Sequence, residues 1–256
     1  MMKRSHFQER VAAVGFALAL VGLWQLLATL QWISPLFFPS PGRTLGALWQ
    51  QAADGRLWEP LLATVERMVW GWLLASVLGV LLGALIAGSL LARRLLDPLL
   101  EFMRPLPASA IIPIAILAFG LSSTMSLAVI AFGSIWPVLL ASVQGFGAVD
   151  ERLREVSAVM RMSAWSRFMK IDLPSAMPGI LAGARVGLAV ALILAVVTEM
   201  QASLTGIGQN ILLAQRSFKT PDLYAGVVLL GVIGFITSTV IQTAENHVLR
   251  WRGSAT

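Results

Sequence analysis

The sequence contains no cysteine, only two histidines, and few charged residues for its length. Without cysteine, no disulfide, thiolate nucleophile or iron–sulfur cluster can form. His6 and His247 lie near opposite ends of the chain, which argues against a shared metal site. Charged residues make up 12% of the sequence, whereas ~25% is usual in soluble domains. The chain is therefore predicted to bind no metal and not to be a soluble domain.

The sequence also lacks the short motifs of nucleotide-binding and hydrolytic enzymes. No glycine precedes any of its three lysines, Lys3, Lys170 and Lys219, so it has no phosphate-binding loop of the form G-x-x-x-x-G-K-[ST]. Neither H-E-x-x-H nor G-x-S-x-G occurs. The net charge of +6 comes without a strongly basic run, which argues against nucleic-acid binding. We therefore expect no enzyme, no cofactor bound by this chain and no nucleic-acid partner.

Long apolar stretches make up most of the chain, with 57% hydrophobic residues and a mean hydropathy of +0.78. A helix needs about 20 mostly apolar residues to cross a bilayer. Six spans are predicted: 11–33, 68–92, a hairpin of two within the uncharged stretch 105–149 broken near 122–124, 176–198 and 223–244. The first could be a signal peptide, but its length and the lack of an A-x-A-like site favour an uncleaved span. The expected fold is an all-α polytopic membrane protein.

The distribution of lysine and arginine predicts the orientation of these spans. With the amino terminus in the cytoplasm, thirteen basic residues fall on the inner side and four on the outer side. Basic residues concentrate on the cytoplasmic side of membrane proteins. We therefore expect cytoplasmic tails at 1–10 and 248–256, an outer segment 34–67 with a short interfacial helix, and a core 68–247.

Small residues and prolines predict how some spans pack and bend. Gly179, Gly183 and Gly187 recur every four residues in the fifth span. Helices in lipid approach closely at such small-residue faces, so these glycines are expected to contact another helix. Pro105, Pro107 and Pro113 each lack a backbone donor, which predicts a bent or locally unwound entry to the third span.

Nine of the 32 charged residues fall between positions 150 and 172, and we call residues 150–174 the charged segment. Asp150 can cap a first short helix, and Ser163 can cap a second one that Pro174 is expected to end. The apolar residues of the first helix share one face of a 3.6-residue period: Leu153, Val156, Val159 and Met160. The segment is predicted to be a cytoplasmic helix–turn–helix with one apolar and one charged face.

Two interpretations of this amphipathic pair remain open. Helices that lie on anionic lipid usually carry an excess of lysine and arginine on their polar face. Here five basic residues accompany four acidic ones. Mixed charge around an apolar stripe suits a protein partner better, because the stripe supplies buried area and the charges set the register. We favour the protein partner.

The charged segment also resembles a known family. Glu155, Arg161 six residues later, and Ile171-Asp172-Leu173-Pro174 are similar to the cytoplasmic signature loop of ATP-binding-cassette importer permeases, E-A-A, three residues, G, about nine residues, I-x-L-P. Other stretches are similar to the branch that takes up nitrate, taurine and alkanesulfonates: Phe38-Pro39-Ser40-Pro41, Arg104-Pro105-Leu106-Pro107, Phe119-Gly120, Thr198-Glu199-Met200 and Gly206-Ile207-Gly208. The resemblance covers about residues 34–250 and implies the type I importer permease fold in a bacterial inner membrane.

In that family the loop docks into a separate ATPase subunit. The resemblance implies this coupling role for Glu155, Val156, Ser157, Ala158, Arg161, Met162 and Ser163. It also implies a second permease copy, two ATP-binding subunits that hold ATP and magnesium, and an extracytoplasmic binding protein that delivers a small, anionic solute. One departure concerns the turn, where Arg161 replaces the family's glycine, a residue that adopts a left-handed backbone at little cost.

Charged residues inside spans are presumptively functional, because each costs about 2.5–3.5 kcal/mol at the bilayer centre. Arg185 is expected to extend toward the headgroups. Glu199, with Thr198 and Gln201, is expected either at the outer interface or in the wall or gate of a translocation path, where Glu199 would pair with a base. Arg67 is expected at the interface. The sequence leaves two alternatives to import, an ion-coupled secondary transporter and a non-transporting membrane scaffold.

Overall fold

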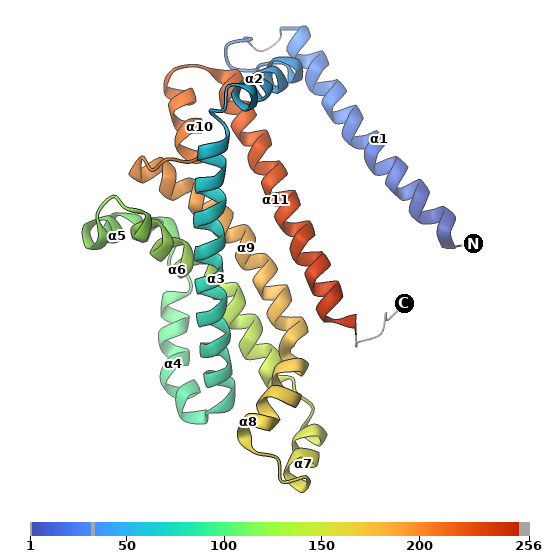
Figure 1. Cartoon of the computed structure of the whole chain (residues 1–256), viewed down its shortest axis with the longest axis vertical. Coiled ribbons are helices and arrows are strands. Elements are labelled where there is room, and N and C mark those ends of the chain that lie inside the picture. Colours follow the sequence, from blue (N-terminus) through green and yellow to red (C-terminus); the bar gives the residue numbers. More distant parts are fainter. Residues whose placement is uncertain (1, 32–33, 251–256) are drawn as a thin grey trace.

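The computed structural model describes residues 2–31 and 34–250, and this part of the chain is built from helices and short connections (Figure 1). The end of the predicted first span, at 32–33, and residues 251–256 of the predicted C-terminal tail lie outside it. The α-helices are α1 (Met2–Thr29), α2 (Pro41–Ala53), α3 (Trp58–Gly88), α4 (Leu90–Met103), α5 (Ile112–Phe119), α6 (Ser123–Gly147), α7 (Glu151–Val159), α8 (Ala164–Arg167), α9 (Leu173–Ala202), α10 (Ile207–Arg216) and α11 (Thr220–Val248). The expected all-α fold is confirmed.

Five helices begin where the sequence supplies a capping side chain. Ser40, Ser89, Ser122, Asp150 and Ser163 precede α2, α4, α6, α7 and α8. In each case the side-chain oxygen accepts a hydrogen bond from a backbone N–H of the first turn, at 2.9–3.4 Å. Such caps satisfy donors that have no partner within the helix.

Four helices of the described chain are long and apolar enough to cross a membrane. They are α3, α6, α11 and the continuous helix Ala164–Ala202, which joins α8, a π-helical turn at Phe168–Asp172 and α9. A fifth crossing is possible only as a pair of segments, Leu90–Met103 and Ala108–Phe119, bent by 87°. Among the residues searched, α1 contributes the shorter apolar stretch Gly15–Thr29. The described residues thus show four such spans, or five with the bent pair, and the expected count of six is not confirmed.

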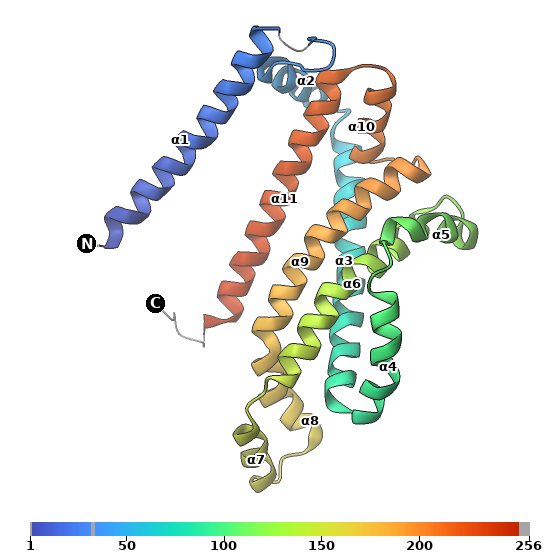
Figure 2. The same cartoon turned by 180° about the vertical axis from the view of Figure 1, so that it is seen from behind.

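The third span is built differently from the prediction. α3 ends at Gly88, and α4 turns back along it (Figures 1 and 2). It carries Arg93 and Arg94, two of the thirteen basic residues that we assigned to the inner side. Pro105 and Pro107 lie in the break between α4 and the 3-10 helix Ala108–Ile111 that leads into α5. Because proline supplies no backbone donor, the helix cannot continue straight through this break. The bend that we expected at the entry to the third span is therefore present. The first helix of the bent pair, Leu90–Met103, nevertheless lies before residue 105, where we expected the span to begin.

The centre of the bundle is formed by α3, α6 and α9, which pack against one another. Gly179, Gly183 and Gly187 of α9 all lie against α6. A Cβ atom at Gly183 would come within 2.5 Å of the Ala141 side chain and 2.7 Å of the Pro137 carbonyl oxygen. The helices can approach this closely only because these positions carry no side chain.

The two ends of the bundle carry different elements. α7 and α8 project at one end of the long axis, and α2 and α10 lie at the other (Figures 1 and 2). α1 diverges from α11 in both views, and it is attached near α2, where Trp24 Nε1 donates to the Pro39 carbonyl at 3.0 Å. α2 is the helix expected within the outer segment, and it exposes Leu45 and Trp49, as suits a helix at a membrane interface.

Candidate functional site

The charged segment forms two short helices at the lower end of the bundle in Figure 1. Asp150 and Ser163 cap α7 and α8, as the sequence predicts. Pro174 does not end the second helix, contrary to our expectation, because the helix runs on to Ala202. The π-helical turn before Pro174 is wider than an α-helical turn and accommodates the proline ring without a break.

The turn between α7 and α8 has the geometry that favours glycine, although Arg161 occupies it. Arg161 has a left-handed backbone with φ of 51°. Its N–H donates to the Ala158 carbonyl, and the Met162 N–H donates to the Ser157 carbonyl, both at 3.0 Å. These two bonds close the helix in a Schellman motif. Arg161 therefore keeps this turn at a conformational cost of ~1 kcal/mol relative to glycine.

The four apolar residues predicted to share one face of α7 are all exposed, Leu153 at 43%, and we call the other three, Val156, Val159 and Met160, the apolar ridge. Their exposed fractions are 50%, 83% and 68%. Trp165 of α8 is also largely exposed. Apolar side chains gathered in this way mark a contact with another protein or with lipid.

The other residues implied in coupling differ in their accessibility. Glu155, Ala158, Arg161 and Ser163 are exposed, and Met162 is half-buried. Ser157 is buried, and its hydroxyl donates to the Arg154 carbonyl at 2.6 Å. Ser157 therefore faces the bundle, whereas its neighbours face outward.

The charged segment is joined to the bundle by aromatic and polar contacts around a cavity of about 360 Å³. Phe168 stacks on Phe146 of α6 with ring centroids 5.8 Å apart. The Arg154 guanidinium donates to the Phe146 carbonyl at 3.0 Å, and Arg167 pairs with Asp172 at 3.3 Å. The contacts with Phe146 attach the segment to the end of α6, and the segment continues directly into α9.

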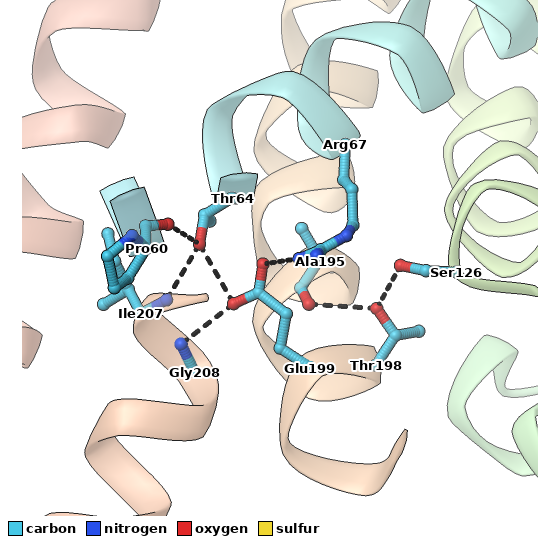
Figure 3. Close-up of polar contacts among 9 residues, drawn as sticks. All are labelled: Pro60, Thr64, Arg67, Ser126, Ala195, Thr198, Glu199, Ile207 and Gly208. Carbon is cyan, nitrogen blue, oxygen red and sulfur yellow. Dashed lines mark hydrogen bonds and ion pairs between the residues drawn. The ribbon is translucent and has the colours of Figure 1, made fainter. Parts of the chain in front are cut away.

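At the opposite end of α9, a buried ion pair joins three helices (Figure 3). Glu199 is fully buried, and its Oε1 accepts from the Arg67 guanidinium of α3 at 2.8 Å. Its Oε2 accepts from the Gly208 N–H of α10 at 2.9 Å and lies 3.0 Å from the Thr64 hydroxyl of α3. The Ile207 N–H donates to Thr64 Oγ1 at 2.9 Å. We call Thr64, Arg67 and Glu199, with these two N–H groups, the Glu199 cluster.

The negative charge of the Glu199 carboxylate is met by the positive charge of Arg67 and by the amino-terminal end of α10. The Ile207 and Gly208 N–H groups belong to the first turn of α10, where the helix dipole favours a negative charge. The Arg67 side chain is only 11% exposed. A buried ion pair tolerates the loss of water only when its remaining hydrogen-bonding groups are satisfied. The cluster therefore fixes the relative positions of α3, α9 and α10.

Two glycines make room for this arrangement. A Cβ atom at Gly206 would lie 2.1–2.4 Å from atoms of the Glu199 carboxyl group, and one at Gly208 would lie 2.4 Å from the Val196 carbonyl oxygen. Neither position can carry a side chain without moving α10 away from α9. The stretches Thr198-Glu199-Met200 and Gly206-Ile207-Gly208 thus belong to one structural unit.

The predicted path or gate residues lie in three different environments. Glu199 pairs with a base, as one interpretation expected, and its side chain is fully buried. Thr198 is buried, with its hydroxyl 2.6 Å from that of Ser126 in α6, whereas Gln201 is exposed. Arg67, which we expected at the interface, is largely enclosed by the protein and pairs with Glu199. The sequence contained one signal for this contact. Arg67 and Glu199 have opposite charges, and they lie at the same expected depth in two antiparallel spans.

Arg185 also forms an ion pair with another helix. Its side chain, which we expected to extend toward the headgroups, pairs with Glu245 near the end of α11. The pair ties α9 to α11 on the side of the bundle that carries the charged segment. Both charged residues within α9 are therefore engaged in ion pairs with other helices.

Comparisons with known proteins agree with this architecture. Residues 75–251 match the family model described as binding-protein-dependent transport system inner membrane component. The chain is 31% identical over 235 residues to the putative aliphatic sulfonates transport permease protein of Bacillus subtilis (strain 168), covering 92% of this chain and 85% of that protein. It is 30% identical over 247 residues to the taurine transport system permease protein of Escherichia coli (strain K12), covering 94% and 90%.

The fold is similar to that of a chain of the MetNI methionine ABC transporter in an inward-facing conformation. The TM-score is 0.56 at 19% sequence identity, covering 83% of this chain and 97% of that one. The resemblance to importer permeases and the expected type I permease fold are thereby confirmed, although the count of six spans is not. The chain belongs to the family of binding-protein-dependent transport system inner membrane components.

Proposed function

We propose that two copies of this multi-pass inner-membrane permease form the translocation path of an ATP-driven importer for a small anionic solute, with a sulfonate as the first candidate. The relatives named as permeases for aliphatic sulfonates and taurine support this class of solute. Two ATP-binding subunits would hold the ATP and magnesium, and an extracytoplasmic binding protein would deliver the solute. Both termini and the charged segment would face the cytoplasm, as the distribution of basic residues predicts.

The observation that carries this proposal is the apolar ridge at the end of the bundle. Val159 and Met160 are 83% and 68% exposed between charged residues of both signs. A protein partner would bury the ridge and match the charges around it, which gives both affinity and register. An ATP-binding subunit is the partner that the family membership supports.

A single helix connects this surface to the Glu199 cluster. The helix Ala164–Ala202 has 39 residues, so it is ~58 Å long at 1.5 Å per residue. It starts in the charged segment and carries Glu199 near its other end, where Arg67 and the first turn of α10 hold it. A partner that pushes the charged segment would therefore move α9, α3 and α10 together, without covalent chemistry in this chain.

In this mechanism Glu199 and Thr198 are positioning residues rather than solute ligands. Both are buried in contacts between helices, with Arg67 and Ser126 respectively. Gln201 is exposed next to them, so it remains our candidate for a residue in the wall of the path.

Co-purification with the candidate ATP-binding subunit in lipid nanodiscs tests the proposal. Glu155 is exposed on α7, and Glu155→Lys reverses a charge beside the apolar ridge. We expect it to weaken association and solute-stimulated ATP hydrolysis ~10-fold or more, because like charges across an interface cost several kcal/mol. Glu59→Lys makes the same change at an exposed position at the start of α3, at the end of the bundle opposite α7, and is expected to leave association with the ATP-binding subunit unchanged.

Two results would contradict the proposal. Unchanged association and ATP hydrolysis of the Glu155→Lys variant would remove the docking role of α7. A binding protein loaded with sulfonate that stimulates no ATP hydrolysis, while another class of solute does, would remove the proposed solute.

A further inference from the structure

Arg161 occupies a backbone position that disfavours it. Its φ of 51° lies in the left-handed region, where a residue with a Cβ atom costs ~1 kcal/mol more than glycine. Among the described residues, Gln31, Ser203 and Phe218 share this conformation. Arg161 is the only one of the four that carries a charge, and the only one in the charged segment.

The turn holds Arg161 in a defined place. The hydrogen bonds from the Arg161 and Met162 N–H groups close α7, and Ser163 caps α8 directly afterwards. Arg161 thus follows Met160, the last residue of the apolar ridge, at a turn fixed on both sides. Its side chain is exposed there.

The charge of Arg161 is not used within the described part of the chain. The arginines that form ion pairs there are Arg56, Arg67, Arg167 and Arg185. A structural role for the guanidinium would require a partner on the same chain, and glycine would form the turn with less strain. The exposed cation at the end of an apolar ridge instead has the composition of an interface rim.

We propose that Arg161 selects the ATP-binding subunit by meeting an acidic side chain at the rim of the surface that covers the apolar ridge. This inference rests on the proposed function. It adds that the ATP-binding subunit presents a negative charge opposite Arg161. The ridge supplies apolar contact that many surfaces could match. The cation sets the register and disfavours a partner that presents a basic residue there.

Arg161→Gly is the decisive variant, because it removes the guanidinium and relieves the backbone at the same time. Glycine fits this turn without strain, so a loss of binding that comes with a weaker salt dependence reports the missing charge. Arg161→Lys keeps the charge, and Arg161→Glu reverses it. Arg216→Glu is the matched control, since Arg216 is exposed at the end of α10, at the opposite end of the molecule.

The measurement is the Kd of the full chain, in nanodiscs, for the ATP-binding subunit at low and high salt. We expect Arg161→Gly to raise the Kd ~10-fold at low salt and to reduce its salt dependence, since exposed charge pairs are screened by ions. Arg161→Glu should raise it further, Arg161→Lys should stay within ~3-fold of the wild type, and Arg216→Glu should have no effect.

An Arg161→Gly variant with wild-type affinity and salt dependence would overturn the inference and leave the proposed function intact. Weaker binding with an unchanged salt dependence would also overturn it, because the turn rather than the charge would then be responsible. A wild-type chain that binds no ATP-binding subunit would instead refute the proposed function itself.

Discussion

Replacing Arg67 by methionine tests whether the Glu199 cluster holds three helices together. The substitution leaves a fully buried carboxylate without its cation, although the Gly208 and Thr64 contacts remain. Removing one partner of a buried ion pair typically costs about 3–5 kcal/mol. At about 2–4 °C per kcal/mol for a chain of this size, the apparent Tm should fall by about 6–20 °C.

The double variant Arg67→Met with Glu199→Gln separates the ion pair from its surroundings. The glutamine retains an acceptor oxygen for the Gly208 N–H, and neither charge remains buried. Exchanging both members of a buried pair for neutral residues is often close to neutral, so the double variant should recover most of the lost Tm. This non-additivity is the signature of a direct contact.

The assay heats the purified chain in detergent. The folded fraction that remains is then measured by size-exclusion chromatography with detection of tryptophan fluorescence. Arg56→Met is the control, because Arg56 forms an exposed pair with Asp54 at 2.6 Å. Such surface pairs contribute about 0–1 kcal/mol. A Tm for Arg67→Met within the range of this control, or a double variant as unstable as the sum of both single variants, would refute the assigned role.

Two glycine substitutions test the close contacts in the same assay. Gly206→Ala should lower the Tm, because its Cβ atom would lie 2.1 Å from the Glu199 carboxyl carbon; Gly46→Ala, with open space around it in α2, should not. Gly183→Ala should separate α9 from α6 and cost about 1–3 kcal/mol, as overpacking does; Gly231→Ala, where the added atom meets nothing within 4 Å, should be neutral or slightly stabilising. If both members of either pair behave alike, that contact does not constrain the fold.

The features that the sequence predicted well are local or summed over many residues. The apolar runs that became α3, α6, α9 and α11 were recognisable because a membrane span needs about 20 apolar residues in succession. α4 was missed because Arg93 and Arg94 interrupt its apolar pattern, and because the prolines near residue 105 suggested the start of a span rather than its middle. Hydropathy averaged along the chain does not recognise a helix with a polar face.

The same distinction applies to the two functional regions. The caps and the apolar periodicity of the charged segment depend on residues within one or two turns, so α7 and α8 could be predicted. The Glu199 cluster depends on residues 132 positions apart, Arg67 and Glu199, whose contact follows from how α3 and α9 pack. The π-helical turn before Pro174 could not be predicted from the sequence either, because the rule that a proline ends a helix does not consider a widened turn.

The state of the charged residues in α9 also bears on how transport could be driven. An ion-coupled carrier needs an acid or base within the membrane that binds and releases its ion in each cycle. In the described chain, Glu199 is fully buried against Arg67, and Arg185 is paired with Glu245. Loading an ion on Glu199 would require breaking its contacts with Arg67, Thr64 and the Gly208 N–H. Energy supplied by a partner at the charged segment requires no such step, because the helix Ala164–Ala202 can transmit the movement while the Glu199 cluster stays intact.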